Sequence, residues 1–284
     1  TPRQRLSLLE DAWKQGGLAV MGTFADLLTN QEANDYVAEF VRNKIGEVVK
    51  DPATAEKLKP RGYPILARRP CLDTGYYEAF NLPHVKLVDC ITDPIVELTA
   101  QGVRTESGEF PLDMLILATG YDGLTGALLA FDVVGRDGRK LNDKWKDGPR
   151  SLLGLMMEGF PNLFMTTGPN GPAALANIIR LSEHDVDWIA ALITHMQAQG
   201  QATVEPVAEA EGDWMQVVHE FAKRTLISKA KTWFVGANVK DKPQGLTMFT
   251  GGFLKYREYC AAAAADGYRK SFTFEPVKEP ALVA

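Results

Sequence analysis

The sequence predicts an α/β fold, in which apolar strands lead through glycine turns into amphipathic helices. Short runs of aliphatic residues, separated by Gly, Pro, Asp and Asn, lie between residues 85 and 117. The stretch from Pro161 to Ile179 then passes from an apolar segment through two Gly-Pro pairs into a helical pattern. Glycine and proline at such a junction leave the helix N-terminus open to a ligand, although a tight turn without a ligand has the same composition. The alternation of strands, glycine turns and helices favours a nucleotide-binding architecture.

Composition and charge narrow the class of protein. The chain has 284 residues, of which 45% are hydrophobic and 24% are charged, and its formal net charge is -5. These values are typical of a globular protein with one large or two modest domains. Nucleic acid is disfavoured as the main partner, because phosphate binding requires a clustered basic face. No run reaches the roughly 18 apolar residues that cross a membrane, so we expect no membrane partner.

The cysteines and histidines match none of the common metal or nucleophile motifs. The three cysteines are far apart and form no CxxC pair, which predicts reduced thiols in a cytoplasmic protein. The four histidines lack metal-ligand spacing such as HExxH, and there is no GxSxG, so we expect no metal. The first residues contain neither a signal-peptide apolar region nor an initiator methionine. We therefore expect a processed product or a piece of a longer chain.

Helical periodicity predicts three helices at the start of the chain. Thr1-Pro2 supplies a capping residue and a proline for the first turn, and Gly16-Gly17 ends the pattern. Apolar residues then recur at helical spacing over residues 30–50. Asp51-Pro52 starts a short polar helix that ends near residue 58.

Strand-like runs follow at residues 85–91, 95–98, 102–105 and 114–117. The Ser107-Gly108 turn predicts a hairpin-like connection between the third and the fourth run. The fourth run continues into Ala-Thr-Gly, and small residues at the carboxyl end of a strand let a cofactor approach the backbone. The GxGxxG phosphate fingerprint, however, is absent from the sequence.

Helices return after the Gly-Pro stretch. A long amphipathic pattern, in which apolar residues recur at helical spacing from Ile178 to Met196, ends at Gly200. Two further helices are predicted over residues 208–226 and 256–265, with a long loop between them.

Two features of these later helices have a structural interpretation. Glu183-His184-Asp185 has the composition of an acid/base set, but three consecutive helical residues point in different directions. We interpret this cluster as a solvated helix face. Trp188 and Trp214 fall on apolar faces, which predicts core positions.

Two further stretches have the composition of a binding site. Arg68 and Arg69 precede a segment rich in apolar and aromatic residues, and guanidinium groups in such company suit phosphate or another anion. An ordinary surface pair is the alternative. Residues 231–243 place an aromatic pair before Gly-Ala-Asn and a basic, proline-bearing stretch, which fits a mobile lid over an anionic ligand. An unremarkable loop is the alternative there.

These stretches together resemble the Baeyer-Villiger monooxygenases, in particular their phenylacetone, cyclohexanone and steroid-type branch. The resemblance extends over nearly the whole chain, but the family's FAD and NADPH glycine fingerprints and its histidine-containing signature are absent. The motifs that carry it occur in the family's order and are Arg68-Arg-Pro-Cys-Leu-Asp-Thr-Gly-Tyr-Tyr-Glu-Ala-Phe-Asn81, Leu117-Ala-Thr-Gly-Tyr-Asp122, Thr125-Gly-Ala-Leu128, Gly159-Phe-Pro-Asn-Leu-Phe164, Gly168-Pro169 and Trp233-Phe-Val-Gly-Ala-Asn238.

The resemblance implies an α/β portion of a flavoprotein that has two Rossmann-like dinucleotide-binding domains and a helical insertion. Residues 1–117 would be the helical insertion and closing strands of the NADPH-binding domain. Residues 118–284 would be the carboxyl-terminal part of the FAD-binding domain, with a mobile loop at about 229–245. The amino-terminal half of the same enzyme would be the partner of this chain. Members of the family use FAD, NADPH and O2 to convert a ketone to an ester or lactone through a flavin peroxide.

The resemblance also assigns residues to the cofactors and the substrate. Arg69 matches the catalytic arginine, which would serve the flavin peroxide and the nicotinamide, because a fixed guanidinium stabilises negative charge in a water-shielded site. Arg68, where the family commonly has lysine, would hold the 2'-phosphate of NADPH, and Trp233 would contact NADP and close the site. The remaining assignments are FAD contacts at Thr119, Gly120, Asp122, Asn177 and Ile178, and a ketone pocket at Ala173, Ala174 and Leu175.

The start of the long helix has a role in this scheme. If the helix begins near Ala173, its free amides and dipole would face the pyrimidine edge of the flavin and favour the anionic reduced form. The preceding Gly168-Pro-Asn-Gly-Pro172 is closer to the cyclohexanone type than to the phenylacetone type, which has Gly-Pro-Gly-Ser-Pro-Ser.

Two other functions are compatible with the sequence. One is a related flavin monooxygenase that oxidises nitrogen or sulfur. The other is a non-catalytic, truncated relative that binds a partner chain or a nucleotide. The second alternative is weaker, because half of a nucleotide-binding domain leaves a broad apolar face uncovered and such faces are rare on monomers.

Overall fold

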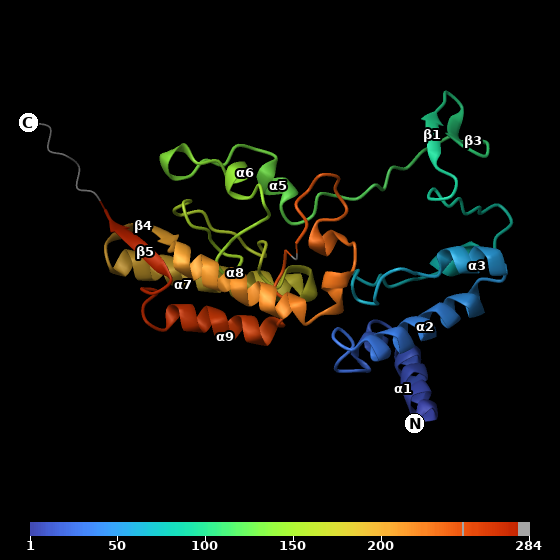
Figure 1. Cartoon of the computed structure of the whole chain (residues 1–284), viewed down its shortest axis with the longest axis horizontal. Coiled ribbons are helices and arrows are strands. Elements are labelled where there is room, and N and C mark those ends of the chain that lie inside the picture. The colour runs from blue at the N-terminus through green and yellow to red at the C-terminus, as the bar shows by residue number, and fades with distance from the viewer. Residues whose placement is uncertain (246, 278–284) are drawn as a thin grey trace, which may run out of the picture. The chain divides into compact units, whose positions relative to one another are not determined.

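The computed structural model describes residues 1–245 and 247–277 and divides the chain into two compact units (Figure 1). The first unit consists of residues 1–66 and 70–121. The second consists of residues 67–69 and the chain from residue 122 onward. The short segment that contains Arg68 and Arg69 therefore belongs to the second unit, although it lies within the first unit's part of the sequence.

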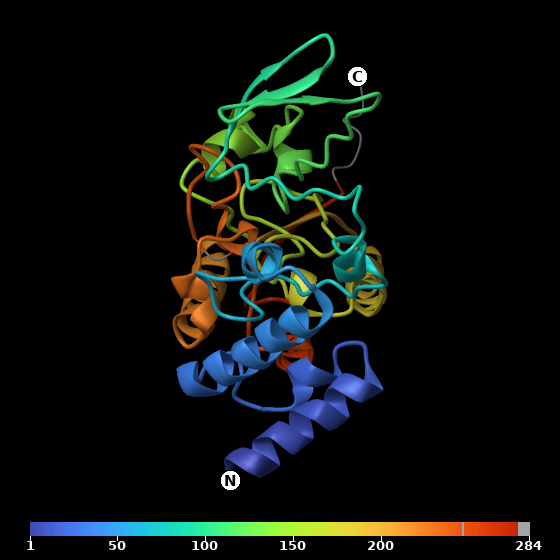
Figure 2. The same cartoon turned by 90° about the vertical axis from the view of Figure 1, so that its right-hand side faces the viewer.

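Side chains cap three helices of the first unit, α1, α2 and α3, and Figure 2 shows α1 and α2 as neighbours near the N-terminus. Thr1, Asn30 and Asp51 accept hydrogen bonds from the first-turn amides of α1, α2 and α3, and the sequence predicted the cap at Thr1 and helix starts at the other two. Leu9, Val37 and Phe40 form the core between α1 and α2. The helices are α1 (Pro2–Gln15), η1 (Ala19–Gly22), α2 (Gln31–Val48), α3 (Pro52–Leu58) and α4 (Tyr76–Ala79).

A three-stranded antiparallel sheet completes the first unit. Its strands, β1 (Ile95–Leu98), β2 (Gly102–Thr105) and β3 (Glu109–Pro111), are ordered β1-β2-β3. The Asp93 carboxylate holds the turn between β2 and β3, because it accepts hydrogen bonds from the Ser107 amide at 2.9 Å and the Thr105 hydroxyl at 2.9 Å. The predicted strands at 95–98 and 102–105 are thus confirmed. The Ser107-Gly108 turn does form a hairpin, but it joins β2 to β3 and not to the run at 114–117.

The strands expected at residues 85–91 and 114–117 are absent from the structure, where both segments are irregular. The apolar side chains of 114–117 are all exposed, with Ile116 at 79%, whereas in 85–91 Ile91 is 92% exposed and Val85, Leu87 and Val88 are half-buried. A strand is stable only when neighbouring strands pair with it and a packed face covers it. The described part of the chain supplies neither for these two runs.

The second unit contains a large hydrophobic core, which is formed by the helices α7, α8 and α9 and the strands β4 and β5 (Figure 1). Trp188 and Trp214 lie in this core, as predicted. The elements are α5 (Gly126–Leu129), η2 (Arg136–Gly138), α6 (Leu141–Lys144), η3 (Ala173–Leu175), α7 (Ile178–Ala198), β4 (Gln201–Pro206), α8 (Ala208–Lys223), η4 (Leu226–Lys229), η5 (Trp233–Val235), α9 (Phe253–Ala264) and β5 (Phe272–Pro276).

The second unit differs from the sequence prediction in two places. The long helix begins at Ile178 and not near Ala173, because Ala173–Leu175 forms a separate 3-10 turn and Asn177 caps the helix. The antiparallel pair of β4 and β5, with Val204 opposite Phe274, was not predicted. This pairing joins segments that are about 70 residues apart, so no local pattern announces it.

Several features bear on the expected partners. All three cysteines are free thiols, and only Cys260 is buried. Among the described residues, no helix has both the length and the apolar character needed to cross a bilayer. No cluster of His, Cys, Asp or Glu within residues 1–245 and 247–277 is arranged to hold a metal ion.

Candidate functional site

The loop of residues 167–173, which leads into α7, has an unusual backbone. Thr167, Asn170 and Ala173 have φ angles of 51°, 70° and 41°, which lie in the left-handed region that side chains disfavour. Three such residues among seven cost free energy, which the surrounding structure must supply. Clusters of this kind are typical of binding and catalytic loops.

A second loop, residues 151–154, packs directly against the first. A Cβ atom on Gly168 would lie 2.3 Å from the carbonyl oxygen of Gly154, so the two backbones touch and only glycine fits. The Ser151 hydroxyl donates a 2.7 Å hydrogen bond to the Pro169 carbonyl and lies 3.2 Å from the Asn170 side-chain oxygen. The two loops therefore form one rigid pair.

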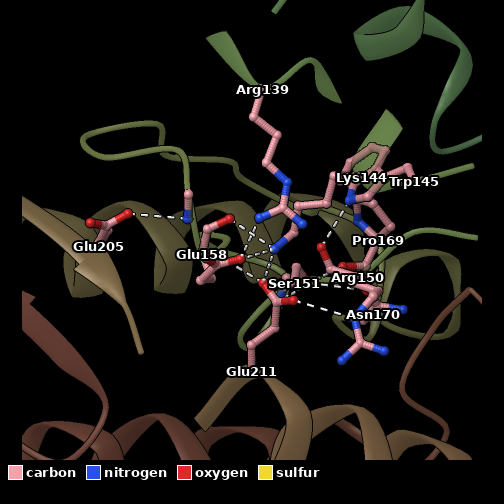
Figure 3. A network of polar contacts seen from close by, with 12 residues as sticks. Arg139, Lys144, Trp145, Arg150, Ser151, Glu158, Pro169, Asn170, Glu205 and Glu211 are labelled. Atoms are coloured by element: carbon pink, nitrogen blue, oxygen red, sulfur yellow. Dashed lines mark hydrogen bonds and ion pairs between the residues drawn. The ribbon is translucent and has the colours of Figure 1, made fainter. Parts of the chain in front are cut away.

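A network of charged groups supports the second loop from α8 (Figure 3). The Lys144 ammonium lies 3.0 Å from the carboxylates of both Glu158 and Glu211. Glu211, on α8, also accepts a 2.9 Å hydrogen bond from the Glu158 amide and pairs with Arg150. Burial raises the pKa of Glu158, but the hydrogen bond from Lys144 and the charges of Lys144 and Arg139 outweigh it, so this pKa lies below its ordinary value. The network fixes the chain on both sides of Ser151.

A relay of backbone hydrogen bonds connects the 167–173 loop to the segment that carries Trp233. The Asn170 amide donates to the Thr247 carbonyl at 2.7 Å, and the Thr247 amide and hydroxyl donate to the Phe234 carbonyl at 3.1 and 2.9 Å. The Phe249 amide donates to the Gly171 carbonyl at 2.8 Å. The Gly-Pro loop and the aromatic loop are therefore neighbours, although more than 60 residues separate them in the sequence.

The aromatic loop in turn contacts the chain just after Ala-Thr-Gly. The Trp233 ring is half-buried and lies against Gly123, where a Cβ atom would be 3.2 Å from the ring. The Lys242 ammonium forms an ion pair with Asp122 and donates to the Gly123 carbonyl at 3.1 Å. Only 10% of the Lys242 side chain is exposed, so this ion pair is a partly buried anchor for the loop.

The Arg68 guanidinium reaches the same loop, since it donates a 3.4 Å hydrogen bond to the Lys231 carbonyl. Arg68 and Arg69 are both exposed. Thus three stretches that the sequence singled out separately meet in the second unit: the paired arginines, the end of the 112–122 segment and the aromatic loop.

The other predicted residues are placed as follows. Asn177 uses its side-chain oxygen to cap α7, accepting from the Arg180 amide at 3.2 Å, while Ile178 is 50% exposed at the first turn. Ala173 is buried, Leu175 is half-buried, and Ala174 lies between them in the 3-10 turn. Thr119 and Gly120 belong to the first unit and are exposed.

Two buried polar groups near these loops escaped the sequence analysis. Asn170 is 1% exposed, and its side-chain nitrogen has no hydrogen-bond partner among the described residues. The Thr125 hydroxyl is likewise buried and unpartnered within that part of the chain. Buried donors normally have partners, and these two fit a ligand that offers acceptor atoms. The sequence signal for Asn170 was its place between two Gly-Pro pairs, where asparagine tolerates a left-handed backbone.

The interpretation of Glu183-His184-Asp185 as a solvated helix face is wrong for Asp185. Glu183 is exposed, but Asp185 is 1% exposed and accepts a 2.9 Å hydrogen bond from the Thr167 amide. Two residues along a helix rotate the side chain by about 200°, so Asp185 lies on nearly the opposite face from Glu183 and enters the core.

Curated proteins of similar sequence match nearly the whole chain. A Baeyer-Villiger monooxygenase of Pseudooceanicola batsensis is 41% identical over 94% of the chain. Cyclohexanone 1,2-monooxygenase of an Acinetobacter species is 39% identical over 98% of it, and phenazine N-monooxygenase of Lysobacter antibioticus is 40% identical over 93%. The chain covers 49%, 52% and 49% of these three relatives, so it spans about half the length of the proteins it matches. No family model matches the sequence.

Solved structures agree with the sequence relatives. A closed structure of cyclohexanone monooxygenase superposes with a TM-score of 0.92 at 39% identity, and it covers 98% of this chain. The chain belongs to the Baeyer-Villiger monooxygenase family, of whose members it matches a carboxyl-terminal portion. The α/β fold predicted for a portion of a flavoprotein is thereby confirmed.

Two further structures of family members contain cofactors. A steroid monooxygenase bound to NADP superposes with a TM-score of 0.89 at 41% identity, over 97% of this chain and 52% of its own. A crystal structure of the OTEMO complex with FAD and NADP superposes with a TM-score of 0.89 at 35% identity, over 96% of this chain and 51% of its own.

Proposed function

We propose that this chain is the carboxyl-terminal portion of an FAD- and NADPH-dependent Baeyer-Villiger monooxygenase, which converts a ketone to an ester or lactone with O2 when joined to its amino-terminal half. The observation that carries the proposal is the meeting of the arginine pair, the aromatic loop and the strained 167–173 loop in one unit. The family membership of the chain and the NADP and FAD complexes of related structures support it.

The residues of the aromatic loop and the arginine pair would bind NADPH. When bound, FAD and NADPH supply the redox chemistry that activates O2, and the protein supplies binding and electrostatics. Arg68, held beside the loop by the Lys231 carbonyl, would bind the 2'-phosphate, and Trp233 would cover the nicotinamide end. Arg69 would be the catalytic residue, because a fixed positive charge stabilises the negative charge that develops on the reacting oxygen atoms.

The 167–178 segment would face the flavin. The first amides of α7 point out of its open N-terminus, which favours a partial negative charge at that place. Asn177 and Ile178 would contact FAD there, and Thr119, Gly120 and Asp122 would contact it at the end of the 112–122 segment. The unpartnered Asn170 amide and Thr125 hydroxyl fit acceptor atoms of the same group. The ketone would lie against Ala173, Ala174 and Leu175.

The amino-terminal half of the enzyme would cover the exposed apolar residues of this chain. Residues 1–117 would complete the NADPH-binding domain, and residues 118–284 would complete the FAD-binding domain, with the loop at about 229–245 moving over the cofactor. Ile91, Met114 and Ile116 would then join sheets whose other strands come from that half. The free thiols fit a reducing cytoplasm, where we place the enzyme.

The test is oxygen transfer by the complete enzyme, that is, this chain joined to its amino-terminal half and loaded with FAD. With NADPH, a cyclic ketone and labelled O2, we expect a lactone that contains one labelled oxygen atom for each NADPH consumed. Consumption of NADPH without any ester or lactone, over a broad panel of ketones, would contradict the proposal.

Oxidation at nitrogen is a second candidate, because the phenazine N-monooxygenase relative is as similar to this chain as the ketone-oxidising relatives. The same preparation should be tested with phenazine and with an organic sulfide. An N-oxide or sulfoxide formed without any ester would favour this second function.

A further inference from the structure

A buried carboxyl group and a buried phenol meet behind the two loops that carry the candidate site. Asp185, on α7, accepts from the Thr167 amide at 2.9 Å through one oxygen, and its other oxygen lies 3.0 Å from the Tyr256 hydroxyl. Tyr256, on α9, is fully buried, and its hydroxyl lies 2.9 Å from the Leu153 carbonyl. The pair thus touches both the 167–173 loop and the 151–154 loop.

The number of protons in this cluster is constrained. A phenol hydroxyl carries one proton, and the Leu153 carbonyl can only accept a hydrogen bond. If Asp185 were ionised, the Tyr256 hydroxyl would face two acceptors with one proton, and one of the two close contacts would not be a hydrogen bond. If Asp185 is protonated, it donates to the Tyr256 oxygen and Tyr256 donates to Leu153. Both buried contacts are then satisfied.

The surroundings favour the protonated form. Burial raises the pKa of Asp185 and outweighs the opposing effects of the hydrogen bonds from Thr167 and Tyr256 and of the nearby His184 ring. Burial also raises the pKa of Tyr256. It raises the pKa of Cys260, which lies one turn further along α9, to about 12. His184, with its ring nitrogen 3.5 Å from Asp185, is the one basic side chain that the described contacts bring to this group.

Asp185 and Tyr256 contact the residues that directly precede the two touching glycines, so the pair can hold the two loops in place. Thr167 directly precedes Gly168, and Leu153 directly precedes Gly154, and these two glycines are the ones whose backbones touch. We propose that Asp185, in its carboxylic acid form, and Tyr256 form a clamp that positions these two loops for FAD. The role toward FAD rests on the proposed function, whereas the protonation of Asp185 does not.

The clamp is tested first by FAD affinity in the complete enzyme, measured by titrating the cofactor-free protein with FAD. Asp185→Asn keeps one acceptor for Thr167 and one donor for Tyr256, so we expect its affinity to stay within about twofold of wild type. Asp185→Ala and Tyr256→Phe each break the chain of hydrogen bonds, and we expect affinity to fall by about tenfold. Glu183→Gln and Tyr259→Phe, on the same helices, are the controls and should leave it unchanged.

Each outcome of this titration decides a part of the proposal. Unchanged FAD affinity in both Asp185→Ala and Tyr256→Phe would overturn the positioning role. An equal loss in Asp185→Asn and Asp185→Ala would overturn the carboxylic acid form. A wild-type enzyme that binds no FAD would overturn the proposed function and, with it, the role of the clamp toward the cofactor.

The protonation of Asp185 has its own test, which needs no FAD. A carboxyl group whose folded pKa lies above its unfolded value stabilises the protein below the unfolded pKa and loses this contribution as pH rises through the folded pKa. The stability of wild type relative to Asp185→Asn, measured by urea unfolding of the cofactor-free enzyme, should therefore decrease as pH rises from about 4. The same decrease should persist when both proteins also carry His184→Gln. A relative stability that increases with pH would show an ionised Asp185 and overturn the proposal.

Discussion

The ammonium group of Lys144 lies 3.0 Å from the carboxylate of Glu211, and both side chains are buried, with 3% and 4% of their surfaces exposed. Removing two charges from water is costly, and their mutual attraction offsets this cost only while both are present. Glu211 also accepts the Glu158 amide and so holds the chain that leads to Ser151 and the Gly-Pro loop. The ion pair therefore links the packing of α8 to the geometry of the candidate site.

The substitution Glu211→Ala should lower the free energy of unfolding by about 3 to 5 kcal/mol, because it removes the buried carboxylate of the pair and leaves the buried Lys144 charge with Glu158, which is 33% exposed, as its remaining carboxylate. Urea unfolding of the complete enzyme measures this change. The control is Glu220→Ala on the same helix, whose ion pair with Lys223 is exposed and should contribute less than about 1 kcal/mol. Equal losses in the two variants would show that the buried pair has no special role. The double substitution Lys144→Met with Glu211→Leu should recover part of the loss.

Much of the first unit could be predicted from local sequence. Thr1, Asn30 and Asp51 cap helices where the pattern placed them, because capping and helical periodicity act within a few residues of the chain. The strand pattern at residues 95–105 was equally informative, since its turn residues and partners are local. The runs at 85–91 and 114–117 are also rich in aliphatic residues, yet they are irregular. An apolar run predicts that some neighbouring segment covers it, but the run itself does not say whether the described residues supply that segment.

The candidate site was only partly accessible from sequence. The paired arginines, the 112–122 segment and the aromatic loop were recognised separately, but the contacts that join them span 110 to 163 residues, as between Arg68 and Lys231 or between Gly123 and Trp233. Asp185 was missed because burial along a helix depends on which neighbours pack against each face, and Tyr256 comes from an element 71 residues away. The roles proposed for Arg68, Arg69 and Trp233 stay predictions.

The contact between Gly154 and Gly168 should tolerate no side chain. In Gly168→Ala the new methyl group would meet the Gly154 carbonyl oxygen at 2.3 Å, so the two loops must separate, and we expect a loss of about 1 to 3 kcal/mol in the free energy of unfolding together with weaker FAD binding. Gly212→Ala is the matched control, because Gly212 lies in α8 with open space around it. That substitution should stabilise the protein by about 0.5 to 1 kcal/mol. A neutral Gly168→Ala would mean that the loops are not in direct contact.

The ion pair between Lys242 and Asp122 should control the opening of the aromatic loop. Lys242→Gln removes a partly buried charge that also bonds the Gly123 carbonyl, so amides 236–242 should exchange with deuterium about tenfold faster. The NADPH concentration for half-maximal rate should rise in the same variant, since the loop would cover the cofactor less often. Lys240→Gln, at an exposed position of the same loop, is the control. Exchange that does not change in Lys242→Gln would place the anchor of the loop elsewhere.

The two adjacent arginines should separate in their kinetic effects, because they are proposed to act on different parts of the ligands. Arg69→Ala should lower kcat by about 100- to 1000-fold, since it removes the charge that stabilises the reacting oxygen atoms, while the KM for NADPH changes less. Arg69→Lys should recover part of kcat, since it restores the charge but not the planar fork.

Arg68→Ala should instead raise the KM for NADPH by about 10- to 100-fold with little change in kcat, as expected for a charge-assisted contact to the 2'-phosphate. Steady-state kinetics with NADPH and NADH separate the two cases, because only the phosphate contact discriminates between these cofactors. The reverse pattern would exchange the two roles, and equal effects would mean that the pair acts as a single anion site.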